Sequence, residues 1–364
     1  MIPRKLTILF LLCCGYFQLQ ADSLSTKYEV SAWTGWGHIW PHVSKVNYLQ
    51  TSHLFHQELA LSFVPDGNKS WHHRYNFTRY GVLFSYNDFG NEEVGLAYSL
   101  VPFYNFSLVR TEKSWLGLRL GIGLGYLTEK WDPDDNWKNI VIGSNLNASI
   151  DLTLNYQYQL FPKLALVGAI SLAHFSNAKY AAPNTGINYP VFMFGLKYRN
   201  FKGQDWVRQD KPVKPDRKWR VETNFGMGAK ENYAADPNKY FSANLTGLVS
   251  YAVSTKSHWG VVLDFVHDSG KIKIAKADRS DKRSNLLAYT AIGLGMTYQL
   301  KVNRTAYLFQ LGTYVLNQSV MEKSFYNRLA IRHFLTDKYG VHVGIRTHRV
   351  NAQTLEVGLI YRWL

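Results

Sequence analysis

The chain has 364 residues, with 41 Lys and Arg against 26 Asp and Glu, which gives a formal net charge of +15. Its two cysteines, Cys13 and Cys14, lie near the N-terminus, so the rest of the chain has no residues for a disulfide framework, a thiolate nucleophile or a cysteine metal site. The 24 Tyr, 20 Phe, 11 Trp and 27 Gly, without a later apolar run of transmembrane-helix length, are a composition typical of membrane β-barrels.

The N-terminus has the pattern of a secretory signal peptide. Arg4 and Lys5 precede an apolar run over residues 6–14, which is too short to span a bilayer as a helix. Ala21 supplies a small residue after the polar stretch that follows. We therefore expect a signal peptide over residues 1–21. For an exported protein, the basic excess favours phosphorylated lipid over nucleic acid as the anionic partner.

Apolar or aromatic residues alternate with small or polar residues along most of the remaining chain, and the runs have the length of tilted membrane strands. The strongest runs cover residues 115–127, 143–160, 163–176, 285–300, 304–316 and 354–364. We count about sixteen segments, or about fourteen without the weakest near the N-terminus. Because sheet edges cannot be left bare in lipid, we predict one closed antiparallel β-barrel of the bacterial outer membrane over residues 22–364.

A soluble β-sandwich would also alternate, so other features must separate the two folds. The number of segments and the aromatic strand ends favour the barrel. The last strand, EVGLIYRWL, places Tyr361 and Trp363 on one face. This ending resembles the C-terminal recognition signal of bacterial outer-membrane proteins, apart from the extra Leu364.

Loop lengths predict which end of the barrel faces outward. If the C-terminus lies in the periplasm, the short turns fall on the periplasmic side and the longer loops fall outside, as in known membrane barrels. The short turns are at 160–163, 254–258, 301–305 and 334–338, and the longer loops are at 128–142, 177–189 and 268–285. Segments 65–78 and 200–218 are too long for periplasmic turns and do not fit this count.

Three polar residues share the face that is predicted to meet lipid. In the segment 163–176 the larger aliphatic residues occupy even positions, and His174 and Ser176 have the same parity at its outer end. Asn188 shares the parity of the aromatic residues that follow it on the next strand. We therefore expect these three residues to converge on the lipid-facing wall near the outer rim.

This grouping suits nucleophilic catalysis. A serine hydroxyl is a weak nucleophile until an adjacent base accepts its proton, and the base needs a third group that fixes its tautomer. A single polar residue here would be an ordinary member of the interfacial belt, whereas three on one face favour a site. On the outer wall, such a site would meet an ester without drawing it out of the bilayer.

The motif at this position resembles that of a known family. HFSN at 174–177, followed by PNTGIN at 183–188, is similar to the His-x-Ser-Asn motif of the outer-membrane lipid A 3-O-deacylases, and in particular of the longer homologues called acyloxyacyl hydrolases. The likeness covers most of the chain and includes residues 121–133, 142–149 and 346–363.

The resemblance implies hydrolysis of an ester-linked acyl chain on lipid A in the outer membrane. Ser176 would be the nucleophile, His174 the general base and Asn177 a member of the oxyanion hole. Lipid A (lipopolysaccharide) and outer-membrane lipids are the implied partners. We find no metal-ligand spacing and no phosphate-binding or nucleic-acid motif in the sequence, so we expect no cofactor and no metal. The sequence leaves the oligomeric state and the acyl position open.

One residue departs from the family pattern. The shorter deacylases have a glutamate where this chain has Asn188, and an asparagine can orient a histidine through its carbonyl oxygen but adds no charge. A Ser-His-Asn arrangement resembles that of the outer-membrane phospholipase A family. Glu356, in the last segment, is an alternative carboxylate. A phospholipase therefore remains an alternative, as does a non-enzymatic pore or structural barrel.

Other histidines and charged runs receive weaker interpretations. His72 and His73, like His38 and His42, have the pattern of loop or interfacial residues. The three residues at 267–269 have the residue types of a triad, but neighbours in sequence do not face one another along a strand. The basic run 271–283 falls in a predicted outer loop, where it either contacts lipid A phosphates or is simply solvated.

Overall fold

The computed structural model describes residues 27–202, 218–236, 238–271, 289–317, 324–348 and 351–364, and the expected signal peptide lies outside these residues. The strands of the N-terminal half are β1 (Lys27–Gly37), β2 (Leu54–Val64), β3 (Arg79–Asp88), β4 (Leu96–Arg110), β5 (Ser114–Leu127), β6 (Leu146–Phe161), β7 (Leu164–Ser176) and β8 (Ile187–Arg199). Those of the C-terminal half are β9 (Trp219–Lys230), β10 (Tyr240–Ala252), β11 (Ser257–Asp268), β12 (Thr290–Val302), β13 (Thr305–Asn317), β14 (Phe325–Phe334), β15 (Tyr339–His348) and β16 (Asn351–Arg362).

Two short helical segments interrupt the loops of the N-terminal half. A 3₁₀ helix covers Ser44–Leu49 after β1, and the helix α2 covers Ser70–Arg74 between β2 and β3. Among the described residues, no helix is both long and apolar enough to cross a membrane.

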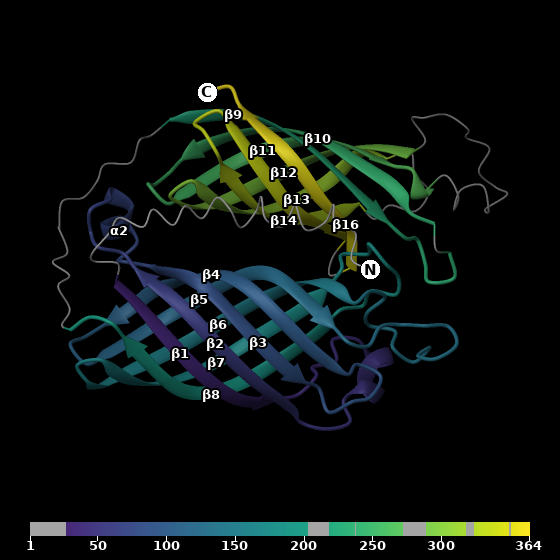
Figure 1. Cartoon of the computed structure of the whole chain (residues 1–364). Helices are drawn as coiled ribbons and strands as arrows, with labels where there is room; N and C mark the ends of the chain where they lie inside the picture. The colour runs from purple at the N-terminus through teal and green to yellow at the C-terminus, as the bar shows by residue number, and fades with distance from the viewer. Residues whose placement is uncertain (1–26, 203–217, 237, 272–288, 318–323, 349–350) are drawn as a thin grey trace.

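The strands close into two separate antiparallel barrels of eight (Figure 1). β1 pairs with β2 on one side and with β8 on the other, which closes the first barrel. β9 pairs with both β10 and β16, which closes the second. The all-β antiparallel architecture is as predicted, but the expectation of one barrel over residues 22–364 is corrected to two. The alternating pattern predicts how many strands form and which of their faces is apolar. It does not predict which strands pair with each other to close a barrel.

The poorly fitting segments now have an explanation. Most of segment 200–218 lies outside the described residues, but it falls between β8, the last strand of the first barrel, and β9, the first strand of the second. Segment 65–78 contains the helix α2. We call the end of the first barrel with loops 38–53, 128–145 and 177–186 its outer end, and the end with α2 its inner end.

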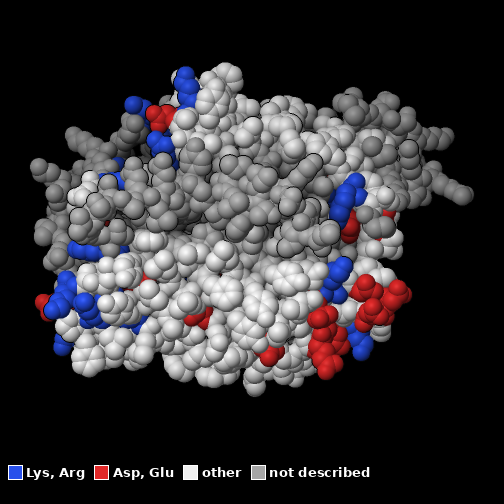
Figure 2. Space-filling view, in the orientation of Figure 1, with Lys and Arg blue, Asp and Glu red and all other residues white. Residues whose placement is uncertain are grey.

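The barrel walls are apolar outside and polar inside, the arrangement of a membrane barrel. In β7, Leu166 and Ile170 are 49% and 52% exposed, whereas Ser171 points inward and is buried. Figure 2 shows charged side chains gathered toward the ends of the molecule, with a broad and mostly uncharged band between them on the first barrel. The predicted parity of the lipid face is confirmed.

Charged side chains bound to one another occupy the interior of the first barrel. Arg119 binds both carboxylate oxygens of Glu58, each at 2.6 Å, and its Nε donates to Asp151 at 2.7 Å. An eight-stranded barrel is only wide enough inside for side chains to fill it. These buried charges are therefore compensated within the wall they come from.

Aromatic rings back the wall at the outer end. Phe175 and Tyr189, which point inward from β7 and β8, stack with centroids 5.6 Å apart, and Phe89 contacts both of them edge-on. All three are at least 98% buried. The strand pair β7–β8 is thus fixed from inside where its outward face carries the predicted site.

The two barrels contact each other toward both ends. At the inner end, the Lys256 ammonium lies 4.9 Å from the ring of Tyr75. Tyr104 of β4 and Tyr307 of β13 meet edge to face, with centroids 6.5 Å apart. At the outer end, loop 177–186 is bound by the loop that follows β9. Contacts at both ends hold the barrels side by side (Figure 1).

Candidate active site at the outer end of the first barrel

The strand register places two of the predicted site residues opposite each other. His174 of β7 pairs directly with Asn188 of β8. Directly opposite residues of antiparallel strands project to the same face with their Cβ atoms about 5 Å apart. The next outward pair along these strands is Leu172 and Pro190, and Phe192 follows on the same face of β8; Leu172 and Phe192 are exposed. The pair therefore lies on the apolar wall, as parity predicts.

The imidazole of His174 is oriented by an amide. Its Nδ1 lies 2.7 Å from Oδ1 of Asn188, and Nδ2 of Asn188 lies 2.9 Å from Nδ1 of His42. Because an amide oxygen only accepts, Nδ1 of His174 carries the proton in this bond. The lone pair of Nε2 is then left to accept a proton from another group, as a general base requires.

Gly186 makes room for that imidazole. Its φ is +81°, a conformation that residues with a side chain rarely adopt, and a Cβ built on it would lie 2.6 Å from Cε1 and 3.2 Å from Nε2 of His174. The register His174↔Asn188 and Phe175↔Ile187 would place Gly186 opposite Ser176. The Nε2 edge of the ring therefore points along the strand toward the level of Ser176.

The hydroxyl of Ser176 is held by the loop that follows it. Ser176 Oγ donates to Oδ1 of Asn184 at 3.2 Å and accepts from Nδ2 of the same residue at 2.9 Å. The backbone N–H of Ala178 also donates to Ser176 Oγ, at 3.1 Å. Ser176 is 5% exposed. Its oxygen thus lies among several donors.

The structure brings His174 and Asn188 together but gives Ser176 a different partner. Within residues 27–202, no hydrogen bond joins His174 to Ser176; the hydroxyl is bound to Asn184 instead. Catalytic hydrogen bonds are often absent or long before substrate binds. A rotation about the Cα–Cβ bond of Ser176 would redirect the hydroxyl.

Asn177 is anchored at both ends of its amide. Nδ2 donates to Oγ of Ser144 at 2.9 Å, and Oδ1 accepts from the backbone N–H of Ala181 at 3.3 Å. Its own backbone N–H donates to Oδ1 of Asn184 at 3.0 Å. Since Nδ2 of Asn177 carries two hydrogens, it has one more to donate besides the one bonded to Ser144.

Three residues of this arrangement have no predicted role from the sequence: Asn184, Gly186 and His42. Asn184 and Gly186 both belong to the PNTGIN stretch, so the signal was present although only its last residue was assigned a role. His42 was interpreted as interfacial, and its contact with Asn188 comes from a loop distant in sequence. Nothing in a single sequence indicates that contact.

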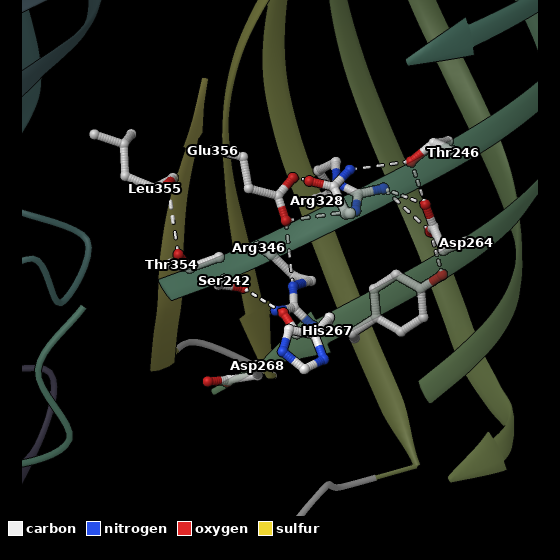
Figure 3. Close-up of polar contacts among 12 residues, drawn as sticks. Ser242, Thr246, Asp264, His267, Asp268, Arg328, Arg346, Thr354, Leu355 and Glu356 are labelled. Atoms are coloured by element: carbon white, nitrogen blue, oxygen red, sulfur yellow. Dashed lines mark hydrogen bonds and ion pairs between the residues drawn. The ribbon is translucent and has the colours of Figure 1, made fainter. Parts of the chain in front are cut away.

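The alternative carboxylate Glu356 belongs to the interior of the other barrel (Figure 3). Arg328 Nε binds its carboxylate at 2.8 Å, and Arg346 Nε lies 3.3 Å from it. Arg328 also binds Asp264 at 2.9 Å, and Thr246 donates to that carboxylate. Glu356 is therefore part of a buried ion network and does not take the place of Asn188.

The weaker candidates have structural roles. His72, at α2, accepts from the backbone N–H of Gly67 at 3.1 Å and lies 3.2 Å from Asp66. Burial lowers the pKa of His72 to about 4, so it is neutral at physiological pH. Asp268 is paired with Lys230 inside the second barrel. Apart from its first residue, the basic run 271–283 lies outside the described residues.

Two family models match the chain, one to each barrel. The model described as lipid A 3-O-deacylase (PagL) matches residues 22–197, and the model described as acyloxyacyl hydrolase, C-terminal domain, matches residues 219–364. The boundary between the matches coincides with the connection between the barrels. A search among curated proteins finds no match.

Solved structures similar to this chain include three barrels of low identity. A mutant porin of Rh. blastica is 8% identical, covering 93% of this chain and 100% of its own, with a TM-score of 0.18. The Acinetobacter baumannii outer membrane protein Omp33 is 9% identical, with coverage of 94% and 100% and a TM-score of 0.18. The Pseudomonas putida toluene transporter TodX is 8% identical, with coverage of 94% and 90% and a TM-score of 0.19. At these scores the similarities carry no functional argument.

Proposed function

Because this chain belongs to the lipid A 3-O-deacylase family, whose models match both of its barrels, we propose that it removes an ester-linked acyl chain from lipid A with Ser176 as nucleophile and His174 as general base. The chain is accordingly an ester-hydrolysing enzyme of the outer membrane, with lipid A as its substrate. The observation that carries the mechanism is the bond between His174 Nδ1 and Asn188 Oδ1, which leaves Nε2 as the proton acceptor.

The proposed reaction has two halves. In the first, Ser176 Oγ attacks the ester carbonyl carbon and its proton passes to His174 Nε2. The tetrahedral intermediate then collapses, the bond to the lipid A oxygen breaks, and that oxygen takes the proton from Nε2. In the second half, water gives a proton to Nε2 and attacks the acyl-serine, and the fatty acid leaves as Ser176 regains its proton.

Donors around Ser176 supply the stabilisation that this reaction needs. Negative charge develops on the former carbonyl oxygen, and donors fixed in advance lower the barrier to its formation. We assign this role to Asn177, whose amide is anchored by Ser144, with the N–H of Ala178 as a second donor close to Oγ. Asn184 holds the hydroxyl until an acyl chain occupies the site.

The place of the site supports a membrane substrate. Leu172, Ile170 and Phe192, which follow His174 and Asn188 along the same outward face, are apolar and exposed, so an acyl chain reaches the site along the wall. A pore is less well supported, because Arg119 binds both Glu58 and Asp151 across the first barrel's interior.

The test is mass spectrometry of lipid A from a host of known acylation that expresses the chain. We expect loss of one acyl chain with the unchanged protein, and full retention with Ser176→Ala or His174→Ala, each costing about 10³-fold or more in rate. Intact lipid A together with fatty acid released from phospholipids would support a phospholipase instead. Intact lipid A together with ion conductance in planar bilayers would support a pore.

A further inference from the structure

The loop that follows Ser176 is bound by the second barrel. The backbone N–H of Glu231, in the loop after β9, donates to the carbonyl oxygen of Lys179 at 3.0 Å. Oε2 of Glu231 accepts from the backbone N–H of Ala182 at 2.7 Å. One residue of the second barrel thus binds the loop at two points, with a side chain that is itself buried.

Lys239 adds a third point. Its ammonium pairs with Oε1 of Glu231 at 2.5 Å and donates to the carbonyl oxygen of Tyr180, also at 2.5 Å. The same ammonium lies 4.2 Å from the centroid of the Tyr180 ring. The Glu231 carboxylate thus accepts from a backbone N–H of the loop, and the Lys239 ammonium donates to a backbone carbonyl oxygen of the same loop.

The backbone held in this way is one that needs support. Ala178 has φ +52° and Lys179 has φ +71°, the left-handed region that residues with a side chain rarely adopt. Such a conformation persists only where surrounding contacts impose it. It turns the N–H of Ala178 toward Ser176 Oγ, at 3.1 Å. Release of Lys179 would let this N–H turn away.

We propose that Glu231 and Lys239 are positioning residues, through which the second barrel holds the loop after Ser176 in its catalytic conformation. They touch neither the reacting atoms nor His174; they act through the backbone of residues 179–182. The inference rests on the proposed function of Ser176, and it assigns the second barrel a part in the reaction of the first.

The experiment uses the full chain in the outer membrane, with kinetics on purified lipid A. We expect Glu231→Ala to lower kcat by about 10- to 100-fold with KM changed less than about 2-fold, because misplaced donors weaken transition-state binding more than substrate binding. Glu231→Gln keeps an oxygen for the N–H of Ala182 and should recover part of the loss. Asn232→Ala is the matched control, since Asn232 donates to Gly270 within the second barrel.

Limited trypsin digestion gives a readout that does not depend on activity. Cleavage after Lys179 should be faster in Glu231→Ala than in the unchanged protein and unchanged in Asn232→Ala. If Glu231→Ala fails to fold, judged by heat-modifiable migration on gels, the same kinetics and digestion are measured on Lys239→Ala. Because Lys239 is exposed, its replacement should leave folding intact. Unchanged kcat and unchanged cleavage in a folded variant would overturn the inference. Faster cleavage of Glu231→Ala, together with an unchanged protein that itself leaves lipid A intact, would uphold the loop contact and reject the proposed function.

Discussion

In the proposed reaction, the side chain at position 188 determines how well the positive charge of the protonated His174 is stabilised. Asn188 accepts from His174 Nδ1 and so fixes its tautomer, but an amide does not stabilise the imidazolium that would form in the proposed reaction when Ser176 loses its proton. His42 binds the other end of the same amide and fixes its orientation. The amide of Asn188 therefore orients the imidazole of His174 but does not add the negative charge that a carboxylate would supply.

Substitutions of Asn188 separate the effect of orientation from the effect of charge. Asn188→Glu should keep or raise the activity and shift the acid limb of the pH profile to higher pH, because a carboxylate stabilises the protonated imidazole. Asn188→Ala should lower kcat by about 10²-fold or more, since the ring loses its orienting partner. Rates of lipid A deacylation against pH measure both effects. Indifference of the enzyme to both substitutions would remove Asn188 from the site.

Gly186 offers a second test at the same scale. In Gly186→Ala the new Cβ would lie 2.6 Å from His174 Cε1, at a φ of +81°, so the imidazole must move. We expect kcat to fall by about 10²-fold, because small displacements of a catalytic group are costly. Gly247→Ala is the matched control, since a Cβ there meets no atom within 4 Å. Normal deacylation by Gly186→Ala would show that the ring does not need this space.

At the scale of the strand, depth in the membrane sets the effect of a substitution. Phe194 and Tyr198 lie on the same outward face of β8, the first near the middle of the strand and the second near its inner end. Phe194→Arg should lower the free energy of unfolding by about 2–4 kcal/mol, and Tyr198→Arg by only about 0–1 kcal/mol. Denaturant titration of the barrel in lipid vesicles measures both. Equal losses would mean that β8 does not cross the bilayer as described.

These strands were largely predictable from the sequence, because a period of two survives wherever one face meets lipid and the other a polar interior. The parity of His174 and Asn188 followed from that period alone. Their direct register did not, since it depends on how the loop 177–186 turns. The partner of Ser176 was also hidden: Asn184 lies in a loop, where side-chain direction has no period.

At the scale of the molecule, the alternating residue pattern does not determine which strands pair to close a barrel. A run of sixteen alternating segments serves one barrel or two equally well. The decision lies in the pairings of β1 with β8 and of β9 with β16, which are contacts between residues far apart in sequence. The long segment 200–218 was the one local sign of a boundary.

Two closed barrels predict that each half folds without the other. A chain ending at residue 202, and one carrying its own signal peptide before residue 218, should each give a compact, heat-modifiable barrel when expressed alone. The reason is that every strand of each half has both of its partners within that half. A chain cut in the turn between β10 and β11 is the control, because it leaves the second barrel open. Folding of the halves only in each other's presence would favour a single barrel.

The separate closure of the two barrels also affects how such a protein can evolve. Loss of the second barrel would cost the first no strand pairing, so the sheet would survive it intact. What would be lost is the hold on residues 179–182. A one-barrel relative must therefore either shorten this loop, place glycine at positions 178 and 179, or supply a new anchor, and its sequence should differ from this one there first.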